Sequence, residues 1–246
     1  MPIWIKRLTW AWMACACGAL MAQTAAPNVP DDLTQIKPPP RSVQDVLRNV
    51  AASKVDQADL ERSKAAIQQP IPESGSQDEF HDFYRRRADG YQRLGNIDAA
   101  IADIRLAATK YRSSNLRFHI ESMIELGILE GRGGNLRNAI RAFEQAKSLV
   151  PQQMTGFHVT LNRLMVGALA VAGDFPAAEA ALREGDAILV SLRRVPNYYT
   201  SFGSWWEMNV ESSRATIFLQ QGRWTEAERS LRMALKKIQT PEDKLI

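Results

Sequence analysis

The sequence predicts an all-α fold in which helix pairs stack side by side into a solenoid with a right-handed superhelical curvature. The first observation is a short turn with a glycine that recurs at positions 95, 134, 173 and 222, with spacings of 39, 39 and 49 residues. The second is that small and large apolar residues keep the same register around each turn. A repeated period of this length, with helical periodicity on both sides of each turn, is typical of stacked helix pairs.

The register can be stated as distances from the turn glycine. An alanine follows it by five residues, a large apolar residue by nine and a small residue by twelve, and a small or branched apolar residue precedes it by seven. Spacings of three and four place these positions on one helical face. The four sets, from the preceding position onward, are Ala88, Gly127, Val166, Ala215; Ala100, Ala139, Ala178, Ala227; Ile104, Phe143, Leu182, Leu231; and Ala107, Ala146, Gly185, Ala234.

Packing alone accounts for these positions, so we assign no chemistry to them. Small residues allow two helix backbones to approach closely, and the large residue is expected to fill the space toward the neighbouring pair. A single pair cannot bury its apolar face, so the pairs must stack. We expect an array over residues 77–246 with four helix pairs, at 80–112, 118–151, 159–194 and 198–237.

The first 22 residues have the layout of a cleavable secretory signal. Lys6 and Arg7 precede an uncharged run from Leu8 to Leu20, and small residues follow. We expect cleavage after Ala22, with Ala25 or Ala26 as later sites and an uncleaved anchor as the alternative. The run is shorter than the roughly 20 residues of a membrane-spanning helix. The sequence therefore predicts export to the periplasm or the cell exterior, with no integral membrane span after cleavage.

Both cysteines lie inside the signal, at positions 15 and 17. The mature chain would then have no thiol for a disulfide, a metal site or a nucleophile. Lipidation at Cys17 is disfavoured because Ala14 stands where a lipoprotein signal has a branched aliphatic residue. Removal of the signal leaves 29 basic and 27 acidic residues, a net charge of +2. This balance argues against nucleic acid as a partner, and we interpret the run at residues 85–87, three arginines, as a solvated helix face.

Two further segments precede the array. Residues 23–41 form a Pro-rich linker that ends in three consecutive prolines, a composition typical of a semi-rigid spacer. Residues 42–76 are expected to hold two short helices and a loop. Ser42 is the expected cap of a helix over Val43–Val50, and a second helix is expected at about Gln57–Gln68. Prolines at positions 70 and 72 break the helical pattern after it.

The array resembles the tetratricopeptide repeat (TPR) family over about residues 80–237. The residues that carry the resemblance are Leu126, Gly127, Gly134, Ala139, Phe143, Ala146 and Pro151, with a second copy at Tyr91, Gly95, Ala100 and Ala107. The resemblance implies a binding fold and does not fix the ligand. Two features depart from the family. The period exceeds its usual 34 residues, and Glu130 replaces a bulky residue, which predicts a local gap or a solvent-facing carboxylate.

The N-terminal region has a narrower resemblance. The order from Pro38 to Leu47, followed by Phe83 to Ala88, is similar to exported bacterial proteins in which repeats precede a CHAT domain, a caspase-like peptidase module. That module would follow the array and would need a His and Cys pair, so its activity is carried over to no residue of this chain. Two interpretations stay open: a repeat-only binding scaffold, or the regulatory and ligand-sensing N-terminal region of a CHAT peptidase.

No catalytic, cofactor or metal site is predicted, so we expect no enzyme. His81, His119 and His158 recur at the starts of first helices, about 10 Å apart as packed helices are, too far to share one ion at about 2 Å. No nucleophile-elbow or phosphate-loop pattern occurs, and the Gly-rich segment 131–135 is interpreted as a helix-pair turn.

The expected partner is another protein or a peptide, bound on the first helices or on the aromatic segment 198–206. Within that segment Tyr199, Phe202 and Trp206 share a helical face with Val210 and are expected to pack, whereas Tyr198 and Trp205 point elsewhere. Core packing and a contact surface remain alternatives for the segment. The Lys and Asn set with which the carboxylate-clamp type of the family holds a peptide C-terminus is not reproduced. By register, the first helices expose Asp82, Arg85, Asp89, Arg93, Ile124, Ile128, Arg163, Gly167, Ser212 and Thr216, and the binding candidates are Arg85, Asp89, Ile128, Arg163, Tyr198 and Trp205.

Overall fold

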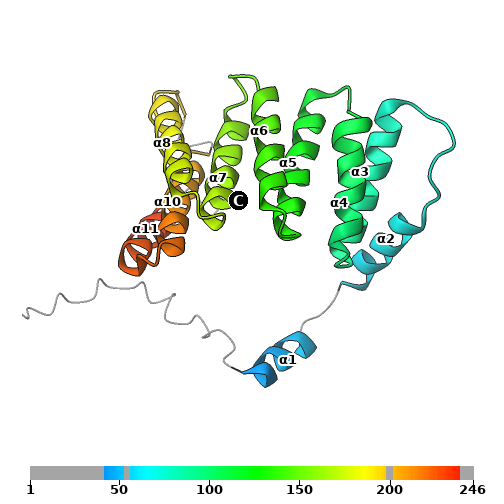
Figure 1. Cartoon of the computed structure of the whole chain (residues 1–246), viewed down its shortest axis with the longest axis horizontal. Coiled ribbons are helices and arrows are strands. Elements are labelled where there is room, and N and C mark those ends of the chain that lie inside the picture. The colour runs from blue at the N-terminus through cyan, green and yellow to red at the C-terminus, as the bar shows by residue number, and fades with distance from the viewer. Residues whose placement is uncertain (1–41, 53–55, 198–201, 239–246) are drawn as a thin grey trace, which may run out of the picture. The chain divides into compact units, whose positions relative to one another are not determined.

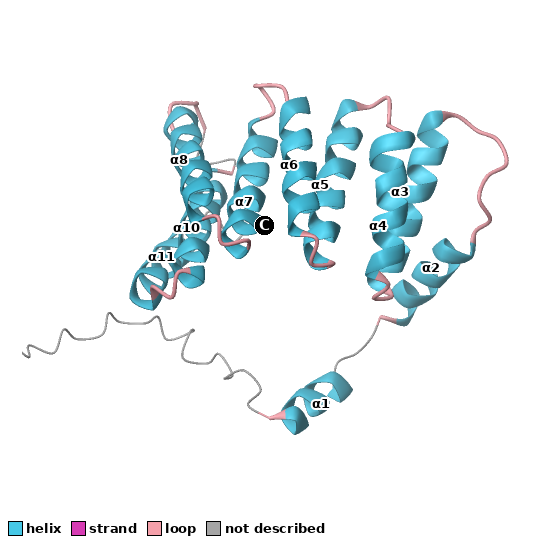
Figure 2. Cartoon of the chain, viewed as in Figure 1, coloured by secondary structure: helices cyan, strands magenta, loops and turns pink. Residues whose placement is uncertain are grey.

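The computed structural model describes residues 42–52, 56–197 and 202–238, which form helices joined by loops (Figure 1, Figure 2). No strand occurs among these residues, so the predicted all-α class is confirmed. The expected signal at 1–22, the linker at 23–41 and Tyr198 lie outside them. The helices are α1 (Val43–Ala52), α2 (Gln57–Gln68), α3 (Gln77–Arg93), α4 (Ile97–Arg105) with the π-helical turn η3 (Leu106–Lys110), α5 (Leu116–Arg132), α6 (Leu136–Leu149), α7 (Thr155–Val171), α8 (Phe175–Leu192), α10 (Gly203–Gln220) and α11 (Trp224–Ile238).

The chain divides into two compact units, residues 1–55 and 56–246. In the first, the described helix α1 begins where the hydroxyl oxygen of Ser42 accepts a hydrogen bond from the Asp45 N–H, at 3.1 Å. In the second, α3, α5, α7 and α10 each pack against the helix that follows them, and consecutive pairs are in contact along the chain. None of the described helices combines the length and apolarity needed to cross a membrane.

Each helix pair is joined by the same backbone turn. The four turn glycines have φ angles of 81°, 82°, 80° and 72°, in the left-handed region that L side chains rarely adopt. The residue after each glycine donates its N–H to a carbonyl five residues earlier, which is the Schellman ending of a helix. These bonds join Asn96 to Tyr91, Asn135 to Glu130, Asp174 to Leu169 and Arg223 to Phe218, at 2.8–3.0 Å. The turn therefore ends one helix and starts the next within three residues.

The predicted register is buried at nearly every position. The small residues before and after the turns are all buried, and so are the first three large residues of the second helices. The exception is Leu231 on α11, which is 41% exposed, beside Trp224 at 67%. Helix α11 is the last of the described helices.

Two of the glycines illustrate close approaches between helices. A Cβ atom at Gly127 on α5 would lie 2.3 Å from the ring of Phe143 on α6, so the ring occupies the space that the glycine leaves. Phe143 thus packs against its own pair partner, and not only toward the neighbouring pair as expected. Gly90 on α3 packs closely against α2. A Cβ atom at Gly90 would lie 3.0 Å from the carbonyl oxygen of Ser63.

Buried ion pairs hold several helices together. Glu130 on α5 is only 2% exposed and pairs with Arg105 on α4, so the expectation that its carboxylate faces solvent is wrong. Arg87 on α3 holds Asp103 on α4 in a bidentate pair at 2.6 and 2.8 Å. The arginine run is therefore no uniform solvated face, because of its three members only Arg86 is exposed.

Candidate binding groove

A groove of about 970 Å³ runs along the first helices of the four pairs and is closed at one end by the turn between α6 and α7. Helices α3, α5, α7 and α10 all contribute to it, because the repeat places their corresponding residues on one side of the array. Its lining consists of Arg85, Arg117, Glu121, Ile124, Glu125, Ile128, Gln153, Met154, Thr155, Gly156, Phe157, Thr160, Phe202, Trp205 and Trp206.

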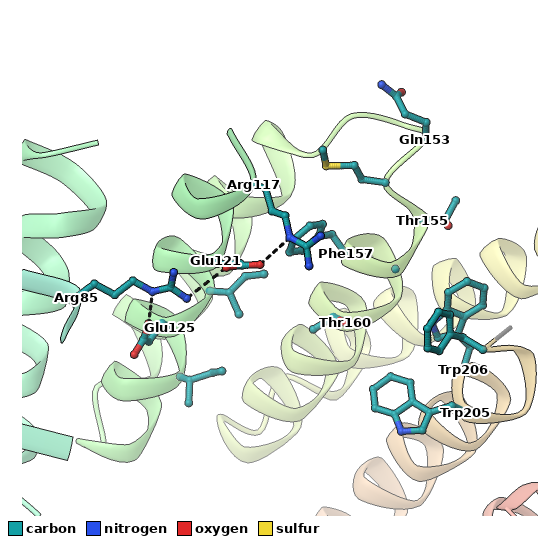
Figure 3. Close-up of a pocket in the computed structure, with 15 residues that line it drawn as sticks. Arg85, Arg117, Glu121, Glu125, Gln153, Thr155, Phe157, Thr160, Trp205 and Trp206 are labelled. Atoms are coloured by element: carbon teal, nitrogen blue, oxygen red, sulfur yellow. Dashed lines mark hydrogen bonds and ion pairs between the residues drawn. The ribbon is translucent and has the colours of Figure 1, made fainter. Parts of the chain in front are cut away.

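One wall of the groove carries a chain of ion pairs between α3 and α5 (Figure 3). Arg85 donates to Glu121 at 3.3 Å and to Glu125 at 3.4 Å, and Arg117 donates to Glu121 at 3.0 Å. Burial raises the pKa of the Glu125 carboxyl, and the neighbouring Arg85 partly offsets this effect. All four charges that line the groove are thus paired with one another.

The opposite wall is aromatic. Trp205 and Trp206 project from the first turn of α10 on the far side of the groove from Arg85 (Figure 3). Trp206 is partly buried and packs on the core around Val210. Its Cζ2 atom lies 4.0 Å from the point where a Cβ on Gly156 would stand. Trp205 stays 42% exposed. Because adjacent helical residues point about 100° apart, one tryptophan anchors the helix and its neighbour faces the groove.

Phe202 differs from the sequence prediction. Its ring is 55% exposed and lies 5.9 Å from that of Trp206, centroid to centroid. The prediction that it packs in the core is wrong because α10 begins at Gly203, so that Phe202 stands before the helix with φ −134° and not on its inner face. The exposed ring adds to the aromatic wall.

Arg163 stands on the same face of α7 as two groove residues, is not itself part of the lining, and forms no ion pair with a described carboxylate. It follows Gly156 by seven residues and Thr160 by three, and this spacing places all three on one face of the helix. Its Nε atom is buried and has no hydrogen-bond partner in the structure, and burial lowers the pKa of its guanidinium. The guanidinium remains charged at neutral pH, because the ordinary arginine pKa exceeds 12.

The six predicted binding residues are distributed as follows. Arg85, Ile128 and Trp205 line the groove, and Asp89 lines an adjoining hollow of about 390 Å³ that shares Arg85. Arg163 stands on the same face of α7 as the lining residues, and Tyr198 lies outside the described residues.

Sequence reasoning missed the two residues of α5 and α7 that close the groove next to the turn. Arg117 lies over the ring of Phe157, with 6.0 Å between the guanidinium carbon and the ring centroid. Both stand in the first turns of their helices, Arg117 two residues before His119 and Phe157 one residue before His158. Their 40-residue separation, close to the repeat period, was the signal that could have found them.

The histidines hold structural positions. His81 is fully buried and its Nε2 lies 2.8 Å from the hydroxyl oxygen of Ser122 on α5. His158 lies 3.2 Å from the carbonyl oxygen of Pro151. Among the described residues, no group of three or more His, Cys, Asp and Glu side chains could hold a metal ion.

Comparison with known proteins gives no assignment. No model of a known protein family matches the sequence, and no curated protein matches it significantly.

Proposed function

We propose that this protein is an exported, non-catalytic scaffold of the TPR type that holds a segment of another protein in the groove along its first helices. The observation that carries the proposal is the groove itself, with exposed tryptophan on one wall and an ion-paired wall facing it. The repeated turns and the shared register support the TPR-like solenoid.

The size and composition of the groove suit a peptide. Pockets for small molecules have volumes of about 300–1,000 Å³, and the 970 Å³ here lies at the upper end while spanning four helices. An extended segment uses such a length better than a compact molecule does. Exposed tryptophans beside partly buried aromatics are the residues that contribute most binding energy at protein interfaces.

The test compares the two adjacent tryptophans. Peptides are selected on the protein from a random display library, and their affinities for Trp205→Ala and Trp206→Ala are measured by fluorescence anisotropy. Trp205→Ala should weaken binding about tenfold or more, as interface anchors do, with an unchanged melting temperature. Trp206→Ala should lower stability, since its ring packs on the core. The proposal fails if no peptide is selected, or if the selected peptides bind Trp205→Ala as tightly as the unchanged protein.

The location proposed from the sequence is outside the cytoplasm. N-terminal sequencing of the protein from the envelope and medium fractions should give a chain that begins at Gln23. A chain that retains Met1 would contradict export by a cleaved signal.

A further inference from the structure

Arg163 is a cation whose partner is missing from the described part of the chain. No described carboxylate lies within ion-pair distance of it, and its buried Nε makes no hydrogen bond. Removing a charged group from water costs free energy unless a partner compensates for it. Arg163 thus places on this face of α7 a cation that no described carboxylate pairs with, whereas the four charges that line the groove are all paired.

An anion bound along this face of α7, next to the groove residues Gly156 and Thr160, would supply such a partner. The guanidinium presents a rigid planar set of donors that matches a carboxylate in a bidentate geometry. The other groove arginines, Arg85 and Arg117, already share Glu121, so a carboxylate that entered there would compete with existing pairs. At Arg163 it would meet no competitor among the described residues.

The geometry of α7 fixes how far this anion stands from the aromatic wall. Trp206 reaches α7 at Gly156, and Arg163 follows by seven residues, or about 10.5 Å at a rise of 1.5 Å per residue. An extended peptide covers that distance with about three residues. We propose, on the basis of the function proposed above, that the groove binds an extended peptide whose apolar residue rests on Trp205 and Trp206 and whose acidic side chain, about three residues away, pairs with Arg163.

The experiment uses synthetic peptides with acetylated and amidated ends, so that side chains supply the only carboxylates. Each peptide carries one leucine or phenylalanine as an anchor and a single glutamate. Across the series the glutamate stands one to five residues after the anchor, or one to five residues before it. A matched set carries glutamine in place of glutamate. Anisotropy of a fluorescein label gives the affinity for the unchanged protein, for Arg163→Gln and for Arg137→Gln. Arg137 is an exposed arginine on α6, outside the groove, and serves as the charge-matched control.

The unchanged protein and Arg137→Gln should bind the glutamate peptide about tenfold or more tightly than its glutamine counterpart, with the best spacing near three residues. In Arg163→Gln the two peptides should bind alike. The variant should keep its helical circular dichroism and melt no lower than the unchanged protein, because it loses an unpaired charge.

An equal preference for glutamate in Arg163→Gln would overturn the inference, while loss of binding on Trp205→Ala would leave the proposed function standing. A second set of peptides with a free C-terminus is measured alongside; a dependence on Arg163 in that set and not in the amidated set would overturn the assignment to an acidic side chain. Failure of every peptide to bind the unchanged protein would overturn both proposals.

Discussion

Gly127→Ala adds one methyl group where the structure leaves no room for it. The new Cβ would stand 2.3 Å from Cε1 and 2.6 Å from Cδ1 of Phe143, and ordinary contact begins at 3.4 Å. The ring is only 3% exposed, so it can move aside only by displacing other core residues. Overpacking of this kind costs about 1–3 kcal/mol. Alanine is better than glycine in a helix by about 0.5–1 kcal/mol, so the expected net loss is at most about 2.5 kcal/mol.

The sign of this effect should depend on Phe143. Phe143→Ala alone should cost about 3–5 kcal/mol, as deletions of core aromatics do. In that background the ring is gone, and Gly127→Ala should then stabilise the protein by about 0.5–1 kcal/mol through helix propensity alone. Gly167→Ala is the matched control, because Gly167 also lies inside a first helix and its Cβ would meet no atom within 4 Å.

Urea unfolding followed by circular dichroism measures all five proteins. For a unit of this size, 1 kcal/mol corresponds to about 2–4 °C in melting temperature, so thermal melts resolve the same differences. If Gly127→Ala stabilises the unchanged protein as much as Gly167→Ala does, the close contact between α5 and α6 is absent and the reasoning fails.

Substitutions at three further positions test other features. Glu207→Gln should cost about 1–3 kcal/mol, because Glu207 is buried and pairs with Lys237 at 2.6 Å and Arg193 at 2.8 Å. Burial opposes ionisation of Glu207, but the two cations outweigh burial and lower its pKa. The difference in unfolding free energy between the two proteins should therefore vanish as the pH falls through that lowered pKa. Gly134→Ala should cost about 1–2 kcal/mol, since φ is 82° there, and Gly134→Asn should cost less in the same melts; equal losses would contradict the turn geometry. Burial and nearby positive charge lower the pKa of His119 below 6.5, so stability should fall as the pH drops below 6.5, and His119→Gln should flatten that slope in urea titrations.

Local periodicity explains why the helices were predictable. Turn glycines, capping residues and small residues at spacings of three and four act within one helix pair, and the sequence displays them directly. The helix Gln57–Gln68 was predicted with the bounds that the structure has. The π-helical turn Leu106–Lys110 left no such pattern, because its residues continue the helical periodicity of α4.

The groove was predictable only in part, for a different reason. Register identifies which first-helix residues share a face, and it brought Arg85, Ile128 and Trp205 to the groove. It cannot tell which long side chains will reach a partner on another helix. Arg85 pairs with Glu121 and Glu125 on α5, whereas the buried Nε of Arg163, at the same register position on α7, has no partner among the described residues. Such outcomes depend on the distance between helices and on side-chain rotamers.

The contact pattern of the helices has a mechanical consequence. Since each pair touches mainly its neighbours, a pair at the end of the row can open without disturbing distant ones, and amide hydrogen exchange should be graded along the row. The groove, however, draws its walls from α3, α5, α7 and α10 at once. A ligand bound there would contact several helix pairs that otherwise unfold separately. Ligand binding would then make the unfolding of these helix pairs cooperative, so that their amide hydrogen exchange becomes uniform.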